Sequence, residues 1–175
     1  NGLTAVSDSH WRGLRGLGVT GQLELDGLEE LSDYGASILA KCVSQKYATG
    51  EPCGAGLYLG RLTEVSDTAV GYLSSSSGRA LSMSGLTHLS DLSAEALSKY
   101  RGESLYLSSL TGLSQRAADA LARFKGRKLC LRGVKDVSDA VADSLSRFQG
   151  HHIFLTLAEP SDAVINYFSR RTIRN

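Results

Sequence analysis

The chain has 175 residues, and its 19 basic and 18 acidic side chains give a formal net charge of +1 at neutral pH. This balance argues against electrostatic capture of nucleic acid or of an anionic membrane surface. No run of 18 apolar residues occurs in the sequence, so no segment is predicted to span a bilayer. The three cysteines are too few for a disulfide framework, and their odd number leaves at least one unpaired within the chain.

An apolar-x-apolar triplet recurs along the chain and opens a 24-residue unit. The last five triplets are evenly spaced with this period, and an earlier one, Leu23-Glu24-Leu25, lies ten positions further upstream than the period would place it. A fixed period of this length is typical of a stacked array, in which each unit buries its apolar face against its neighbours. Residues 1–175 are therefore expected to form one solenoid domain. Its units are predicted to begin near residues 23, 57, 81, 105, 129 and 153.

Residues 1–22 look like a unit without its strand. Gly2-Leu3-Thr4 matches Gly85-Leu86-Thr87 of a later unit, and Trp11 falls where the inner face of a helix is expected. Without a strand in this part, the strand at Leu23 would form an uncovered edge with unpaired amides and carbonyls. We therefore expect either a further unit upstream in a longer protein or self-association through this edge.

Each full unit is predicted to contain one strand and one helix, with position 1 as the first residue of the triplet. Apolar residues at positions 1 and 3 indicate a short strand with one buried face. Serine at position 10, usually followed by aspartate, indicates a helix start, because its hydroxyl can accept from a free helix amide. Glycine at position 22 indicates the helix end, through the left-handed conformation that glycine tolerates. The predicted strands are 23–25, 57–59, 81–83, 105–107, 129–131 and 153–155.

The ten extra residues of the first interval fall within 42–56. Insertions in solenoids leave the array as loops on one face and often contribute to binding, although a tolerated surface loop explains them equally well. Cys42 occupies the position that an aromatic residue takes in later units, so it is expected to be buried. A disulfide between Cys42 and Cys53 would close the insertion but requires an oxidising compartment, and the sequence leaves both states open.

The last unit is predicted to end in a helix that begins at Pro160-Ser161-Asp162, after which residues 169–175 become polar and basic. A polar final unit suits a cap, since the end of an array must face water. The basic tail also suits contact with an acidic partner, and both interpretations are open.

The motifs that would indicate catalysis or cofactor binding are absent from this sequence or out of context. Residues 16–21 match G-x-G-x-x-G, but they are expected to end a helix and enter a strand, the reverse of the order in a dinucleotide site. His151 and His152 are adjacent in a turn with no cysteine or carboxylate motif nearby, which argues against a metal site. Glu24 and Asp26 share one face of a strand, an arrangement that suits a cation or acid–base chemistry but is more often a solvated surface. We therefore predict a protein without enzymatic activity, cofactor or metal.

The strand face that points away from the predicted helices carries the most informative pattern. Position 2 places large aromatic residues on alternate strands, about 10 Å apart, with other residue types between them. Aromatic residues provide much of the binding energy of protein interfaces, and small neighbours leave notches for partner side chains. Shielding of the strand backbone is an equally simple role for these rings. If the face binds a partner, the predicted contact residues are Glu24, Asp26, Tyr58, Ser82, Ser84, Tyr106, Ser108, Arg132 and Phe154.

The unit resembles the leucine-rich repeat, in particular a bacterial, planctomycete-like variant with the same 24-residue period. The closest match is Leu81-Ser82-Met83-Ser84-Gly85-Leu86-Thr87-His88-Leu89-Ser90-Asp91, followed by Ala94, Ala96, Leu97 and Gly102. The asparagine usual in such repeats is replaced by leucine or valine at position 6, so recurring threonines and the position-10 serines are candidates for its hydrogen bonds. The resemblance implies an α/β fold, a right-handed solenoid with short parallel strands on one face and short helices on the other.

The same resemblance implies a scaffold that binds other proteins. The leading hypothesis is a non-enzymatic module that binds a protein or peptide on its exposed sheet face, without affinity for nucleic acid or membrane. The alternative is a structural spacer within a longer array, with no dedicated ligand, and carbohydrate binding by the aromatic row is a third hypothesis. Alanine at Tyr58, Tyr106 and Phe154 separates the first two, since a spacer tolerates it and a binding module loses affinity while staying folded.

Overall fold

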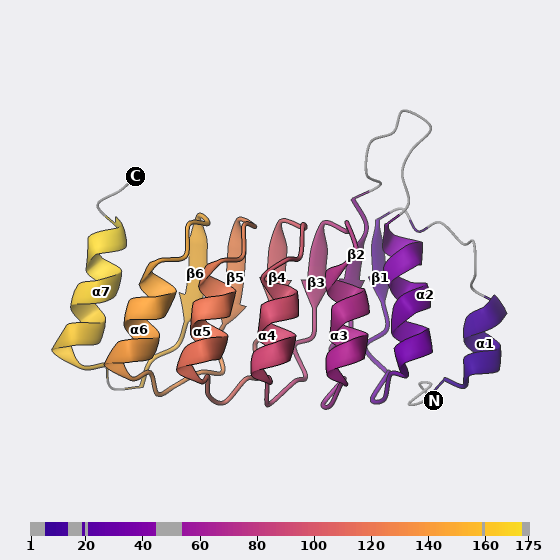
Figure 1. Cartoon of the computed structure of the whole chain (residues 1–175), viewed down its shortest axis with the longest axis horizontal. Helices are drawn as coiled ribbons and strands as arrows, with labels where there is room; N and C mark the ends of the chain where they lie inside the picture. The colour runs from indigo at the N-terminus through magenta and orange to yellow at the C-terminus, as the bar shows by residue number, and fades with distance from the viewer. Residues whose placement is uncertain (1–5, 14–18, 20, 45–53, 159, 173–175) are drawn as a thin grey trace.

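The computed structural model describes residues 6–13, 19, 21–44, 54–158 and 160–172 (Figure 1). The chain forms two layers, a row of helices and a sheet that lies behind it in the view of Figure 1. Strands and helices alternate along the chain, and the order of strands in the sheet is their order in the sequence. This arrangement is compatible with a solenoid of repeated strand–helix units.

The six strands are short and follow the 24-residue period. They are β1 (Gln22–Glu24), β2 (Gly56–Tyr58), β3 (Ala80–Ser82), β4 (Ser104–Tyr106), β5 (Lys128–Leu131) and β6 (His152–Leu155). All neighbouring strands pair in parallel, and equivalent residues of successive units align, as Leu57 does with Leu81. The predicted parallel strands are confirmed, although each begins one residue earlier than predicted.

Seven helices form the second layer in the described part of the chain. They are α1 (Asp8–Gly13), α2 (Asp33–Val43), α3 (Asp67–Ser74), α4 (Asp91–Leu97), α5 (Gln115–Ala122), α6 (Asp139–Ser146) and α7 (Asp162–Thr172). From α2 to α7, the serine before each helix accepts a hydrogen bond from the amide three residues later, so the predicted serine caps are confirmed. No helix among these is both long and apolar enough to cross a membrane.

The capping serines also join each unit to the one before it. The hydroxyl of Ser114 donates to Asp91 Oδ1 over 2.5 Å, and that of Ser161 donates to Asp139 Oδ1 over 2.9 Å. The same link joins Ser32 to Asp8, Ser66 to Asp33 and Ser90 to Asp67. We call this row of bonds the serine–aspartate ladder; among the described residues it is interrupted at Ser138, because the preceding unit has Gln115 in place of aspartate. The ladder thus supplies hydrogen bonds between successive units, a role for which the position-10 serines are candidates from the sequence.

The core lies between the two layers and is most complete in the middle of the array. Leucine or methionine at positions 1 and 3 of the units from 57 to 131 is fully buried. At the two ends the equivalent residues, such as Leu25 and Ile153, are half-buried. Trp11 covers part of the first end, as expected from its place in the sequence, and its indole Nε1 donates to the Val6 carbonyl over 3.0 Å.

A second apolar row runs beneath the turns that follow the helices. The rings of Tyr100, Phe124 and Phe148 stack with centroids 6.1 and 6.2 Å apart, so one aromatic side chain from each unit contacts the next. Cys42 occupies the same position two units earlier and is buried, as predicted. Cys53 lies outside the described residues, so the predicted alternative of a Cys42–Cys53 disulfide is untested.

The glycines at position 22 are required for space, which corrects the reason predicted from the sequence. None of them has a positive φ; among the described glycines that conformation occurs at Gly21 and Gly54. A Cβ on Gly126 would instead overlap the Phe124 ring and lie 2.7 Å from the Gly102 carbonyl. The helices therefore end without a left-handed residue at this position, and glycine allows successive turns to approach each other closely.

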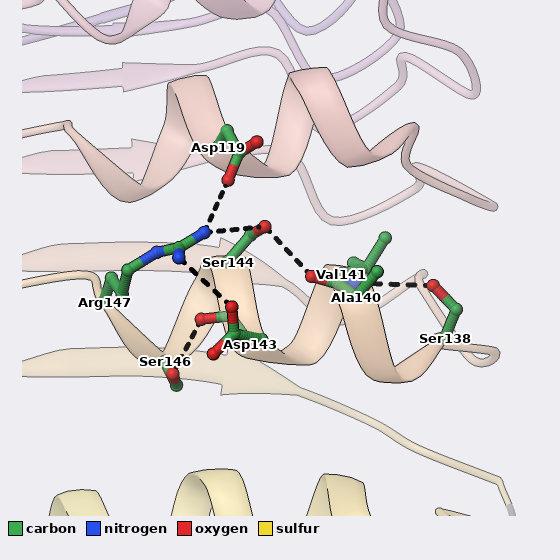
Figure 2. Close-up of polar contacts among 8 residues, drawn as sticks. All are labelled: Asp119, Ser138, Ala140, Val141, Asp143, Ser144, Ser146 and Arg147. Carbon is green, nitrogen blue, oxygen red and sulfur yellow. Dashed lines mark hydrogen bonds and ion pairs between the residues drawn. The ribbon is translucent and has the colours of Figure 1, made fainter.

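Ion pairs link neighbouring helices on the surface of the helical layer. Figure 2 shows the guanidinium of Arg147, which contacts Asp119 of the preceding unit over 2.7 Å and Asp143 of its own helix over 3.1 Å. Arg123 makes the equivalent contact to Glu95 one unit earlier. Because these side chains are largely exposed, each pair contributes little to stability.

Candidate functional site

The face of the sheet that points away from the helices is built from three rows of side chains. The rows are position 0 (the residue before each triplet), position 2 and position 4, and we call them together the outer face. Parallel pairing holds positions 0 and 2 in line across all six strands, and position 4 lies two residues further along the chain. Position 2 consists of Glu24, Tyr58, Ser82, Tyr106, Cys130 and Phe154. Position 0 consists of Gln22, Gly56, Ala80, Ser104, Lys128 and His152, and position 4 of Asp26, Gly60, Ser84, Ser108, Arg132 and Thr156.

The three aromatic residues of position 2 lie on the outer face, as predicted. Tyr58, Tyr106 and Phe154 are half-exposed, whereas the leucines on either side of Tyr58 on the same strand are fully buried in the core. This alternation is the signature of a strand with one face in the core and one in solvent. The rings are therefore available at the surface of a rigid sheet.

Two residues of position 2 are buried, and one of them, Ser82, is among the predicted contact residues. Ser82 is 6% exposed and Cys130 is 5% exposed, although both belong to the outer face. Each lies on a strand between two strands that carry aromatic rings, and the larger neighbours cover it. The small residues thus form the floor between the rings, and Ser82 offers a partner less contact surface than predicted.

The ring of Tyr58 lies along its own strand toward position 0. A Cβ on Gly56 would lie 2.7 Å from the Tyr58 ring, so only glycine leaves room for this orientation. Partial burial raises the pKa of the Tyr58 hydroxyl, and the nearby Tyr106 and Glu24 raise it further while Arg79 opposes them. The hydroxyl therefore stays protonated at neutral pH and can donate a hydrogen bond to a partner.

Phe154 is held between a histidine and an arginine at the other end of the face. Its ring stacks on His152 with the centroids 5.9 Å apart, and the Arg132 guanidinium carbon lies 5.4 Å from the ring centroid. This distance is within the range of a cation–π contact. The three side chains form a compact surface that is both apolar and basic.

Asp26 has a structural contact that the sequence did not reveal. Its Oδ1 accepts a hydrogen bond from the Gly60 amide over 2.9 Å, across to the next unit. A Cβ on Gly60 would lie 2.5 Å from this oxygen, so the contact depends on glycine. The Glu24–Asp26 pair is therefore an asymmetric one, in which Asp26 fixes a turn while Glu24 remains exposed.

Serine side chains make up much of the middle of the face. The hydroxyls of Ser82 and Ser84 lie 3.0 Å apart, and the Ser108 hydroxyl lies 3.4 Å from the Cys130 sulfur. These contacts confirm that positions 2 and 4 share one face. The hydroxyls satisfy one another locally, and the surface they form is polar without carrying charge.

Charge is separated along the outer face. The carboxylates of Glu24 and Asp26 lie on the first unit, and the cationic side chains of Lys128 and Arg132 lie on the fifth. The nine outer-face positions contributed by the three units between them carry no charged residue. Lys128, like His152, belongs to position 0, a row that sequence reasoning missed because it placed the start of each strand one residue later. An acidic end, a neutral middle and a basic end therefore follow one another across the sheet.

The described residues show no arrangement suited to metal binding. Within them, no group of three histidine, cysteine, aspartate or glutamate side chains is placed to hold a metal ion. The His151 and His152 rings are tilted relative to each other with centroids 6.3 Å apart. Most of the 16–21 glycine motif lies outside the described residues. The outer face, with its aligned aromatic, acidic and basic side chains, is thus the candidate binding surface of the described structure.

Compared with protein-family models and with curated proteins, the chain gives no match.

Proposed function

We propose that the chain is a leucine-rich repeat protein of the bacterial 24-residue type, and that it is a non-enzymatic module that binds a protein or peptide on its outer face. The unit consensus, the serine-capped helices and the parallel sheet support the family. A right-handed coil is proposed on general grounds, because strand–helix–strand connections between parallel strands are almost always right-handed.

One observation carries the proposed function. Tyr58, Tyr106 and Phe154 remain half-exposed in one row on alternate strands, whereas the large hydrophobic residues exposed elsewhere in the described chain are scattered over three helices. Aromatic rings on a rigid sheet lose little entropy when they bind, and they are enriched among the residues that dominate interface energies. Partly buried serines between the rings provide hydrogen-bonding groups for a polypeptide backbone.

A site-directed cross-linking experiment tests this proposal. A photo-reactive phenylalanine analogue would replace Ser84 on the outer face, and Leu92 on the exposed side of α4 as the comparison site. We expect covalent adducts with other polypeptides from the Ser84 position and few from the Leu92 position. The adducts should disappear when Tyr58, Tyr106 and Phe154 are changed to alanine.

A matched control uses the three large hydrophobic residues that are exposed elsewhere in the described part of the chain. Tyr72, Leu92 and Ile165 lie on α3, α4 and α7 and are 44%, 69% and 48% exposed. Their triple alanine variant should keep the outer-face adducts, and circular dichroism should show that both triple variants are folded. Adducts that survive loss of the outer-face rings would contradict the proposal and favour the alternative, a spacer without a dedicated ligand.

A further inference from the structure

The outer face is complementary in shape to a second copy of itself whose strand order is reversed. This complementarity follows from the arrangement of large and small residues on the face. Aromatic residues occupy position 2 on the even-numbered strands β2, β4 and β6, and other residue types occupy it on the odd-numbered strands. In a sheet of six strands, reversing the strand order exchanges even and odd strands. A second copy placed face to face, with its order reversed, therefore sets each ring opposite a position without a ring.

We propose that a second copy of this chain is the partner of the outer face, and that the two copies form a two-fold symmetric dimer. The symmetry axis runs parallel to the strands and passes between β3 and β4, so that β1 faces β6, β2 faces β5 and β3 faces β4. Symmetric dimers of this kind use one self-complementary patch on both copies. The inference rests on the proposed function, because it identifies the polypeptide that the outer face binds.

Size complementarity holds at the centre of this arrangement. Tyr106 of one copy faces Ser82 of the other, and Tyr58 faces Cys130. Both small residues are already the buried floor between two rings, so the opposite ring is received in a shallow depression. Stacked sheets lie about 10 Å apart, which leaves room for one layer of side chains from each copy. Their strands usually differ in direction by about 30°, so these central pairings are the best defined.

The longest basic side chains face glycines. Lys128 at position 0 of β5 lies opposite Gly56 at position 0 of β2, and Arg132 at position 4 lies opposite Gly60. The Tyr58 ring occupies the space above Gly56, and the Asp26 carboxylate occupies the space above Gly60. The carboxylate of Asp26, which accepts from the Gly60 amide, is then next to the opposite Arg132. Lys128 is thus placed against the Tyr58 ring, which suits a cation–π contact, and Arg132 is placed against a carboxylate of opposite charge.

Charge selects this orientation among the two-fold alternatives. With the axis parallel to the strands, Glu24 on β1 meets the surface formed by Phe154, His152 and Arg132. With the axis perpendicular to the strands, β1 would meet β1 and β5 would meet β5, so that like charges would face each other. Like-charge contacts across an interface are unfavourable, which disfavours the second arrangement.

The area of the face sets the strength of the expected association. Six strands span about 24 Å and the three rows span about 16 Å, on the order of 400 Å² per copy. This is about half of the area per partner in a standard stable interface, so the dimer should dissociate on dilution and weaken as salt is added.

A charge-exchange experiment tests the dimer, with sedimentation velocity as the readout. The first variant is Glu24→Lys and the second is Arg132→Glu, both at exposed residues. In each variant alone, the symmetric dimer brings like charges together twice, and we expect the dissociation constant to rise at least tenfold over that of the unchanged chain. In an equal mixture, the new lysine of one variant meets the new glutamate of the other and the remaining pair keeps its native charges, so mixed dimers should form.

Three results would overturn the dimer. They are a wild-type chain that stays monomeric at the highest soluble concentration, association that neither substitution weakens, and a mixture that fails to restore dimers. The control Leu92→Glu on α4 should leave association unchanged. A monomer whose Ser84 adducts with other polypeptides are lost in the outer-face triple alanine variant would overturn the dimer and leave the proposed function standing. A monomer with no such adducts would overturn both.

Discussion

Gly126 lies in a turn that packs against the turn of the preceding unit and against the ring of Phe124. The same contacts recur at Gly102 and Gly150, so the close approach is a property of the repeat and not of one unit. The Phe124 ring and the Gly102 carbonyl oxygen limit what this position can hold. Neither can move without displacing the row of stacked rings or the adjoining turn.

Gly126→Ala should therefore lower the free energy of unfolding by about 1–3 kcal/mol, because the new methyl group overlaps Phe124 and the Gly102 backbone. The comparison is Gly71→Ala in α3, where an added Cβ meets no atom within 4 Å. That substitution should raise stability by roughly 0.5–1 kcal/mol through helix propensity. Urea denaturation of both variants measures the difference, and equal effects would contradict a steric requirement at Gly126.

Ser76 is a residue at which a substitution is expected to raise the free energy of unfolding instead of lowering it. It takes the place in its unit that Tyr100 takes in the next, and its buried hydroxyl has no hydrogen-bond partner within the described structure. Ser76→Ala should raise stability by about 1 kcal/mol, because a buried hydroxyl without a partner is costly. Ser74→Ala in the same helix end should lower stability, since the Ser74 hydroxyl donates to the Gly71 carbonyl over 2.9 Å. Thermal unfolding that ranks the two variants in the other order would refute this account.

At the scale of elements, the serine–aspartate ladder connects the starts of neighbouring helices and is interrupted at one place in the described chain, between α5 and α6. Ser138 caps α6 over 3.3 Å but has no aspartate to bond in the preceding unit, where Gln115 stands. The interruption separates the last two helices from the rest of the row. Restoring the link should couple them more tightly to α5.

Gln115→Asp is expected to complete the ladder and raise stability by about 1 kcal/mol, from one added hydrogen bond and a favourable charge at the start of α5. Gln115→Glu is the matched control, because it adds the same charge on a longer side chain that is not the residue used elsewhere in the ladder. Denaturation midpoints should rise more for Asp than for Glu. A rise of the same size in both would assign the effect to the helix dipole alone.

The ladder also makes stability depend on pH. The hydroxyls of Ser90 and Ser93 donate to Asp67 and hold its pKa below the usual range. A carboxylate with a lowered pKa in the folded state contributes stability that is present above its unfolded pKa and is lost as the pH falls through the folded value. The stability of Asp67→Asn should thus fall less between pH 6 and pH 2, roughly the window of this titration, than that of the unchanged chain. Circular dichroism during an acid titration of both proteins measures the difference, and an equal loss of stability in the two would contradict this account.

Sequence reasoning located the elements well because the repeat carries its information locally. The triplet at Leu81 and the serine at Ser90 predict a strand and a helix start without knowledge of any distant residue, and both are confirmed. Burial on the outer face was predicted less well. The exposure of Ser82 and Cys130 depends on how neighbouring rings lie, and the orientation of Tyr58 depends in turn on the absence of a side chain at Gly56. Contacts of this kind cross between units and are not visible in one period of the sequence.

At the scale of the whole molecule, stability should vary along the array. Each unit contacts its neighbours, so a unit at an end is supported from one side while a central unit is supported from both. In agreement with this difference, the core residues of the first and last strands are only half-buried. The described chain is thus expected to open from its ends before its centre.

Hydrogen exchange can measure this gradient with amides that are all hydrogen-bonded between neighbouring units. The Met83 and Leu107 amides donate to the Tyr106 and Cys130 carbonyls in the middle of the sheet, over 3.0 and 2.9 Å. The Leu25 amide donates to Tyr58 at one end over 2.8 Å, and the His152 amide donates to Arg127 at the other over 2.9 Å. We expect protection to be at least tenfold greater for the central pair, corresponding to about 1.4 kcal/mol of local stability. Uniform protection would indicate that the array unfolds as one cooperative block.

Because successive units align in register with a 24-residue spacing, the chain can be lengthened or shortened only by whole units. Removal of residues 81–104 would bring Leu105 beside Leu57 and Ser114 beside Asp67, so sheet, core and ladder would all close again without mismatch. The surface pattern would not survive, because Tyr58 and Tyr106 would become neighbours on a sheet of five strands. Removal of two consecutive units, 81–128, would restore the alternation. Removal of an odd or an even number of these units would thus keep the same fold. The odd number would place the rings on neighbouring strands of the binding surface, and the even number would keep them on alternate strands.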